Sequence, residues 1–205
     1  MTNIDMTKED EGLINETLGI KNSTNKDMNF LPDDYQIPVE AGNYMKFKDD
    51  ENIFRVLSSP ILGYEYWIDT EDGKRQPIRK TMTEIIDISK VPDPSEIKHF
   101  WALVVYNYKA SYNSVKKEYI GKVQILEITQ KSIQKTMRAL AGNPKWGNPR
   151  DYDLVVSKTG QKLETRYTVT PDPKAPLDPK IKKQYESMTI NLEALFEGLD
   201  PFEQK

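Results

Sequence analysis

The chain has 205 residues, a formal net charge of -3 and no cysteine, so disulfides, thiol nucleophiles and thiolate zinc sites are excluded. Its single histidine, His99, argues against His-rich metal centres and a His-based catalytic dyad. No apolar run approaches the roughly 18 residues of a transmembrane helix, and the N-terminus lacks the basic-then-apolar pattern of a signal peptide. We therefore expect a soluble, cytoplasmic protein without a metal or other cofactor.

The charges are distributed unevenly along the chain. Residues 1–30 hold six acids and three lysines, and residues 189–205 hold four acids and one lysine, so each end has a net charge of −3. Residues 74–166 hold 18 basic and nine acidic residues, a net charge of +9. This pattern predicts a flexible acidic arm over 1–30, a basic domain over 31–178 and a helical, acidic C-terminal tail over 179–205.

Most of the predicted elements are strands, as alternation of apolar and polar residues indicates. In chain order the pattern predicts strands over 43–47, 52–57 and 61–67, a turn over 71–74 and a return strand over 76–80. A long apolar and aromatic strand follows over 99–108, then a polar loop over 109–118 and another strand over 123–128. The second half of the chain adds a hairpin, with strands over 153–157 and 164–169 around a turn over 158–162.

Helical signals are fewer. Thr129 can cap a helix over 130–140, which Gly142 would end. A second short helix is expected over about 179–187, after a proline-rich spacer, and a third over 191–196 that forms on docking. The fold class expected from these elements is mainly β (α+β): a five-stranded Greek-key barrel with extra hairpins, one mid-chain helix and short C-terminal helices.

Enzyme motifs are missing from the sequence. There is no P-loop, no Gly-x-Ser-x-Gly elbow and no His-Glu-x-x-His pair. Acidic clusters at Asp33-Asp34, 49–51 and Asp151/Asp153 could bind Mg²⁺ in a nuclease, but acids in such turn-like contexts usually cap or solvate the backbone. We expect the protein not to be an enzyme, with a metal-dependent nuclease as a remaining alternative.

Aromatic and basic residues are interleaved in several segments. Single-stranded nucleic acid needs cationic groups for its phosphates and flat faces on which unpaired bases stack. The hairpin tips at 71–75 and 158–162 would form the walls of the groove that binds the single strand. The stacking candidates are Tyr64, Tyr66, Tyr106 and Trp146, and the phosphate candidates are Lys74, Arg75, Arg79, Lys122, Lys158 and Arg166. Because alternate residues of a strand face inward, about half of the aromatics are expected in the core instead.

Five stretches together resemble a known family: residues 52–67, 100–108, 123–133, 146–160 and 163–171. They are similar to a group of tailed-bacteriophage proteins regarded as single-stranded DNA-binding proteins of the OB-fold type. The resemblance covers about residues 30–178. It implies that residues 31–178 form an OB-like nucleic-acid-binding domain, a barrel that coats viral single strands during replication and recombination in the host cytoplasm. The zinc ribbon of zinc-containing phage relatives, which uses Cys and His ligands, is not carried over, because this chain has no cysteine and a single histidine.

The acidic C-terminal tail has two interpretations. It resembles the acidic tails of bacterial single-strand binders, which end in Pro-Phe, although here Glu203-Gln-Lys205 follow Phe202. Such a tail would recruit replication or recombination proteins through Phe196, Asp200 and Phe202 and would screen the groove, so deleting 189–205 would tighten DNA binding. Alternatively, it is a short helix that folds back onto the domain. A further alternative for the whole chain is a replisome or recombination adaptor with little DNA affinity of its own.

Overall fold

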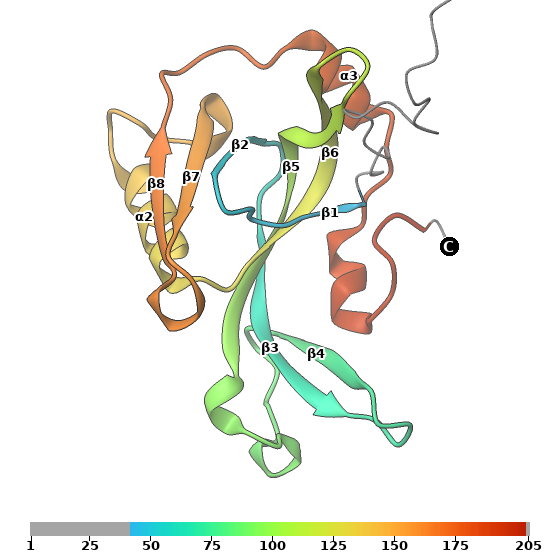
Figure 1. The fold of residues 1–205 in the computed structure, drawn as a ribbon. Helices are drawn as coiled ribbons and strands as arrows, with labels where there is room; N and C mark the ends of the chain where they lie inside the picture. The colour runs from blue at the N-terminus through green and yellow to red at the C-terminus, as the bar shows by residue number, and fades with distance from the viewer. Residues whose placement is uncertain (1–41, 204–205) are drawn as a thin grey trace, which may run out of the picture. The chain divides into compact units, whose positions relative to one another are not determined.

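The computed structural model describes residues 42–203, which belong to one compact unit spanning Pro38–Lys205. The predicted arm over 1–30 and the Asp33-Asp34 pair lie outside the described residues. The chain forms an eight-stranded sheet and a few helices (Figure 1). The strands are β1 (Tyr44–Met45), β2 (Glu51–Val56), β3 (Ile61–Asp69), β4 (Arg75–Thr81), β5 (Lys98–Asn113), β6 (Glu118–Ile128), β7 (Asp153–Thr159) and β8 (Arg166–Pro171).

The helices lie mainly after the sixth strand. The two α-helices are α2 (Lys131–Gly142) and α3 (Pro179–Glu186). Short 3₁₀ helices are η1 (Ile88–Lys90), η2 (Pro94–Glu96), η3 (Pro149–Asp151), η4 (Lys162–Glu164) and η5 (Leu192–Glu197). The mainly β class expected from the sequence is confirmed.

The sheet forks around its longest strand, β5. One side of β5 pairs with β6 along most of its length. The other side pairs with β3 over 98–102 and with β2 over 105–107. Beyond β2 the sheet continues to β7 and β8, and beyond β3 it continues to β4. One strand therefore holds two branches of the sheet together (Figure 1).

The fork arises at residues 57–60, where the chain leaves the ladder between β2 and β3. Val56 is opposite Val105 and Ile61 is opposite Ala102. The segment that joins β2 to β3 is therefore two residues longer than the part of β5 that it faces. The Leu57 amide still donates to the Val104 carbonyl at 2.9 Å. The Val104 amide donates at 2.9 Å to the Ser58 hydroxyl, which replaces the missing backbone acceptor.

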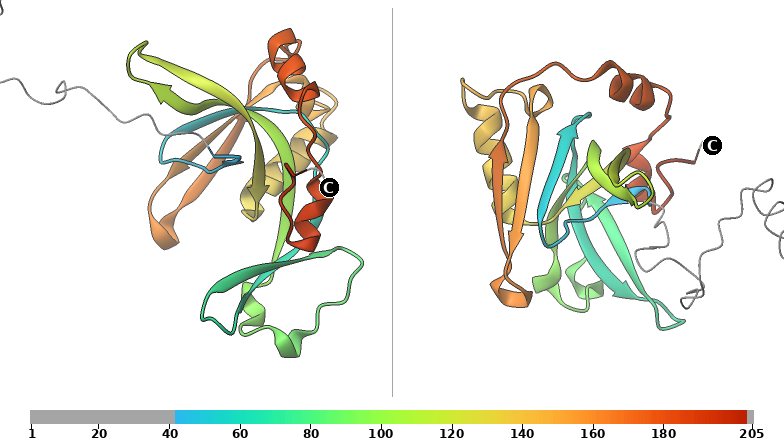
Figure 2. Two further views of the ribbon diagram at one scale, coloured as in Figure 1. Left: turned by 90° about the vertical axis from the view of Figure 1, so that its right-hand side faces the viewer. Right: turned by 45° about the horizontal axis from the view of Figure 1, so that its top comes forward.

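Both faces of the β5–β6 pair are covered. On one face, Leu103, Val105 and Leu126 join the main core with β2, β7 and the buried side of α2. On the other face, Phe100, Val104 and Ile125 pack against the C-terminal segment over 177–202. Figure 2 shows α3 and the chain that follows it along this second face. The alternation of strand side chains explains the two cores, because neighbouring apolar residues of β5 point to opposite faces.

The sheet is open, and the five-stranded Greek-key barrel that the pattern predicts is not confirmed. Within the described residues, β8 pairs with β7 alone, and the outer edge of β6 pairs in parallel with the short strand β1. Tyr44 lies opposite Ile125 and Met45 opposite Leu126. Because the segment before β2 takes the edge of β6, that edge is not available to β8. The rings of Phe47 and Tyr167 approach to 5.7 Å between centroids across this opening.

Several boundaries differ from the predicted ones. The loop expected over 109–118 is a strand pair in which Tyr112 lies opposite Tyr119, and the turn is confined to 114–117. Helix α2 is confirmed, but it begins at Lys131 without a side-chain cap from Thr129. The turn between β7 and β8 covers 160–165 rather than 158–162. The polar composition of 109–118 favoured a loop in the prediction. In the structure, cross-strand pairing provides hydrogen-bond partners for the backbone of this segment.

Candidate nucleic-acid interface

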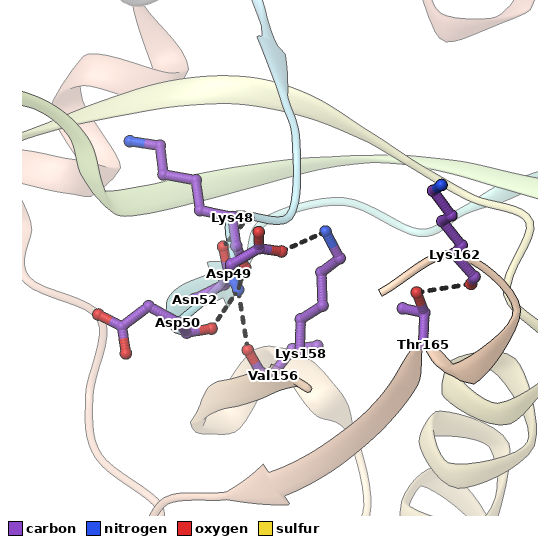
Figure 3. Close-up of polar contacts among 8 residues, drawn as sticks. All are labelled: Lys48, Asp49, Asp50, Asn52, Val156, Lys158, Lys162 and Thr165. Atoms are coloured by element: carbon purple, nitrogen blue, oxygen red, sulfur yellow. Dashed lines mark hydrogen bonds and ion pairs between the residues drawn. The ribbon is translucent and has the colours of Figure 1, made fainter. Parts of the chain in front are cut away.

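The predicted phosphate-binding residues are mostly engaged in ion pairs. Lys74 lies 2.9 Å from Asp72, and Arg75 lies 2.8 Å from Glu96. The largely buried guanidinium of Arg79 bridges Glu65 at 2.9 Å and Glu127 at 3.0 Å. Lys158 contacts Asp49 (Figure 3), and this hydrogen bond raises the pKa of Lys158. These charges are locally neutralised, so none of the four offers an unshared positive charge to a phosphate.

The positive charge in the sequence is concentrated elsewhere. Residues 61–97, which contain the β3–β4 hairpin, hold five basic and eight acidic residues. Residues 98–150 hold ten basic residues against Glu118 and Glu127. The positive part of the molecule therefore begins at β5 and includes β6, α2 and the loop after it, rather than the 71–75 hairpin tip.

The predicted stacking residues are largely packed. Tyr66 is buried, and Tyr64 lies against the ring of His99 at 5.8 Å. Tyr106 packs edge-on against Tyr108 at 5.1 Å in the core beneath α3, and burial, followed by the nearby carboxylate of Asp178, raises its pKa. Trp146 is half-buried against Tyr152 at 5.6 Å, with the ammonium of Lys145 5.3 Å from its ring centroid. Trp146 thus keeps a partly accessible ring, and Tyr66 does not.

The two remaining candidates lie in different places. Arg166 is exposed at the start of β8, where it lines an open pocket of about 610 Å³ with Gly160 and Glu164. Lys122 lies opposite Asn107 in the β5–β6 ladder and donates to the Asn43 side chain at 3.3 Å. Lys122 contacts the wall of the cleft described next through Asn43, and Arg79 contacts it through Glu127.

A cleft lies at the opening of the sheet. Its volume is about 900 Å³, and its walls come from residues 42–48, from Asn107 and Ala110 of β5, from Gln124 and Glu127 of β6, from Gln130, and from Tyr167 of β8. A smaller hollow of about 70 Å³ shares Lys46, Lys48 and Asn107 with this cleft. It adds Lys109 and Tyr119 on one side and residues 50–52, which include the acids Asp50 and Glu51, on the other. The cleft therefore extends from the interior of the open sheet toward the β5–β6 hairpin.

Buried amide groups hold the wall of the cleft. Asn107 donates to the Gln124 side chain at 2.8 Å, and Gln124 donates to the Gly42 carbonyl at 2.6 Å. These bonds fix the start of the described chain to β6. Gln130, at another point of the wall, has a buried side-chain carbonyl with no hydrogen-bond partner among residues 42–203. That oxygen can accept a hydrogen bond from an amino group in the cleft.

A tight turn positions Lys48 (Figure 3). The Asn52 side chain donates to the carbonyls of Lys48, Asp50 and Val156 at 2.8–3.1 Å, and it accepts from the Lys48 amide at 2.8 Å. With the backbone fixed in this way, the Lys48 ammonium reaches the Lys109 carbonyl at 3.3 Å. The same turn directs Asp49 to Lys158 on the other side.

The β5–β6 hairpin carries an accessible aromatic pair that the sequence reasoning did not select. The rings of Tyr112 and Tyr119 lie 5.2 Å apart and are 43% and 55% exposed, and the Lys109 ammonium lies 5.6 Å from the Tyr119 centroid. Lys116 and Lys117 form the adjacent turn. The signal that could have identified this pair is the symmetric position of the two tyrosines around the turn at 114–117.

The acidic clusters do not gather into a metal site. Asp153 binds Arg55 and Tyr108, and Asp49 binds Lys158. In the part of the chain that the structure describes, no group of three or more His, Asp or Glu side chains is arranged to hold a metal ion. None of the described helices combines the length and apolarity needed to cross a membrane.

The predicted partner-binding residues of the tail lie on the sheet. Phe196 packs edge-on against Phe100 at 5.9 Å, Phe202 joins the same core, and Asp200 accepts a hydrogen bond from the Phe202 amide at 3.0 Å. The C-terminal segment is thus folded back onto β5 in this structure.

Comparison with known proteins gives no family assignment: the chain matches no protein-family model, no curated protein and no solved structure.

Proposed function

We propose that this chain is a non-catalytic protein that binds single-stranded DNA with little sequence preference and acts in phage DNA replication and recombination. The observation that supports this proposal is the cleft along residues 42–48 together with the hollow beside it. Lys46 and Lys48 line the cleft, and Lys109 and the accessible ring of Tyr119 line the hollow. Lys46, Lys48 and Lys109 would contact phosphates, and Tyr112 and Tyr119 would stack on bases.

An OB-like arrangement is part of this proposal. OB folds are five-stranded, partly open Greek-key barrels. The pairing of β2 with both β5 and β7, the hairpins β5–β6 and β7–β8, and the position of α2 between β6 and β7 support it. In this arrangement β1 and the cleft occupy the opening between β6 and β8.

A salt titration with matched variants tests the proposal. We expect a fluorescein-labelled oligo-dT to bind the protein at about 50 mM salt and to be released as salt rises. Lys46, which is exposed and has no acidic partner among residues 42–203, would contact one phosphate. Lys46→Ala should therefore reduce the slope of log K against log salt by about 0.7. Tyr119→Ala should weaken binding by about 1–3 kcal/mol, which is the contribution of one stacked base.

The matched control is Lys74→Ala, because Lys74 is exposed but paired with Asp72 on the β3–β4 hairpin, whose four basic and four acidic residues cancel. We expect this variant to bind like the parent protein. Equal losses in Lys46→Ala and Lys74→Ala would contradict the assignment of the cleft. Absence of binding at low salt would favour a protein-binding adaptor, and degradation of the oligonucleotide with Mg²⁺ would favour a nuclease.

A further inference from the structure

Exposed apolar side chains gather at both ends of β5. The loop over 82–97, which leads into β5, exposes Met82, Ile85 and Ile88, and Ile85 is 94% exposed. The β5–β6 hairpin tip, at the other end of the strand, exposes Val115 and Ile120, and Val115 is 88% exposed. Scattered surface apolar residues are ordinary, but groups of them at defined loops indicate contact surfaces.

The two groups carry opposite charge. Residues 82–97 contain Lys90 against four acids, of which Glu84, Asp87 and Glu96 are ion-paired with Lys80, Lys90 and Arg75. With these partners included, the branch over 61–97 still has a net charge of −3. Residues 109–122 contain four lysines against Glu118, a net charge of +3. An acidic apolar loop and a basic apolar tip are complementary both in their apolar surface and in their charge.

The two surfaces cannot meet within one molecule. Strand β5 has 16 residues, which span roughly 50 Å at about 3.3 Å per residue. Figures 1 and 2 show the 82–97 loop and the β5–β6 hairpin at opposite ends of this strand. A second copy of the chain can bring its tip to the loop of the first copy.

We propose that the chain associates with itself head to tail, with the hairpin tip around Val115 of one copy docking on the loop around Ile85 of the next. Two different surfaces at opposite ends form a heterologous contact, which extends into an open row unless the rotation closes a ring. This property goes beyond DNA binding. Copies in a row along β5 would place their clefts in sequence on one strand.

The expected interface is small, because each surface consists of a few side chains on a loop. Interfaces below about 1,200 Å² are usually weak and transient. Self-association of the free protein is therefore expected only at high concentration, and it should strengthen at low salt because the surfaces carry opposite charge. Neighbours held on one strand would associate at a much higher effective concentration.

Sedimentation velocity of the free full-length chain, without DNA, tests the proposal. The average mass should rise beyond that of a dimer as concentration increases from about 10 µM toward about 1 mM, the range in which weak contacts form. Ile85→Ser and Val115→Ser each remove one surface and, given their exposure, leave the core unchanged. Each variant alone should remain monomeric. Leu199→Ser, an exposed apolar residue outside both surfaces, is the control and should associate like the parent protein.

Mixing the two variants gives the decisive readout. Each variant keeps one intact surface, so an equimolar mixture should form one-to-one dimers and no longer species. A parent protein that stays monomeric at all concentrations would overturn the proposal. Loss of association in only one of the two variants would also overturn it, because that result means a surface pairs with itself. Since the measurement contains no DNA, its outcome is independent of the proposed DNA binding.

Discussion

At the scale of single residues, the carboxylate of Asp153 organises the junction of the two cores. It accepts from the buried guanidinium of Arg55 and, at 3.1 Å, from the Tyr108 hydroxyl. Arg55 also donates to the carbonyls of Arg150 at 3.2 Å and Ala175 at 3.0 Å, so one ion pair ties two loops to the sheet. A buried charge of this kind is tolerated because every partner is satisfied.

This junction predicts a loss of stability in alkali. Burial, helped by the carboxylate of Asp153, raises the pKa of Tyr108 to about 12. The folded state therefore retains the proton that the unfolded chain loses near pH 10, and the stabilisation is complete below pH 10 and lost as pH rises to about 12. Each pKa unit corresponds to about 1.4 kcal/mol, so we expect about 1–3 kcal/mol to be lost over this range.

Urea unfolding of the parent and of Tyr108→Phe between about pH 8 and 11.5 measures the contribution of Tyr108 to the free energy of unfolding. The variant should show a shallower alkaline decline than the parent protein. Tyr112→Phe removes a phenol from the exposed hairpin and serves as the comparison. Identical alkaline slopes for the parent and Tyr108→Phe would rule out the assigned role of Tyr108.

The residue scale is also where sequence reasoning was weakest. Counting charges located the basic part of the chain between 74 and 166, but it could not show which charges are neutralised. The pair Arg79–Glu65 depends on the register of the β3–β4 hairpin, and Lys158–Asp49 joins residues 109 positions apart. Such pairs follow from tertiary contacts, which single-sequence patterns do not contain.

At the scale of elements, the C-terminal segment is part of the core. Leu195 is 3% exposed and packs with Phe100, Ala102 and Ile125. Gly63 shows how closely this segment approaches β3, because a Cβ at Gly63 would lie 2.8 Å from the Phe196 ring. Removing residues 189–205 would expose apolar surface of β5, so loss of stability would accompany any change in DNA affinity.

Leu195→Ala should therefore destabilise the fold by about 2–5 kcal/mol, the usual cost of truncating a buried leucine. Chemical denaturation monitored by tryptophan fluorescence measures the change. Leu199→Ala is the matched control, because Leu199 is 41% exposed and four residues further along the same segment. A cost below about 0.5 kcal/mol at Leu195, typical of surface positions, would mean that the segment does not contribute to the core in solution.

Elements with strong apolar periodicity were predictable. The long run at 99–108 became β5, and the helical spacing of Ile133 and Met137 became the buried side of α2. The tyrosine hairpin was not predicted, because its strands are polar and are stabilised by cross-strand pairs rather than by burial. The edge strand β1 has two residues, and its parallel partner in β6 lies about 80 positions away, so no local pattern marks it.

At the scale of the whole molecule, the acidic residues of the first 37 positions outweigh the charge of the rest. Residues 1–37 hold eight acids and three lysines, a net charge of −5, whereas the unit Pro38–Lys205 has a net charge of +2. Removing residues 1–37 should therefore tighten binding to oligo-dT at low salt, because the remaining protein repels a polyanion less. The gain should vanish near 0.5 M salt, where the screening length is only a few ångströms.

Fluorescence anisotropy of the full-length and shortened chains over a range of salt tests this electrostatic effect. A chain shortened by the same 37 residues but extended with an uncharged Gly/Ser segment separates charge from chain length. If the extended chain binds like the full-length protein at low salt, the effect comes from length and the electrostatic explanation fails.

The forked sheet has a consequence for how the molecule opens. Strand β5 is paired on both edges, with β6 along one and with β2 and β3 along the other, so both branches are attached to the same strand. Amide hydrogens in the centre of β5 should exchange with deuterated solvent only through global unfolding, whereas those of β4 and β8, at the ends of the branches, should exchange through local opening. Hydrogen-exchange mass spectrometry would thus find one slowest-exchanging strand that spans both branches of the sheet.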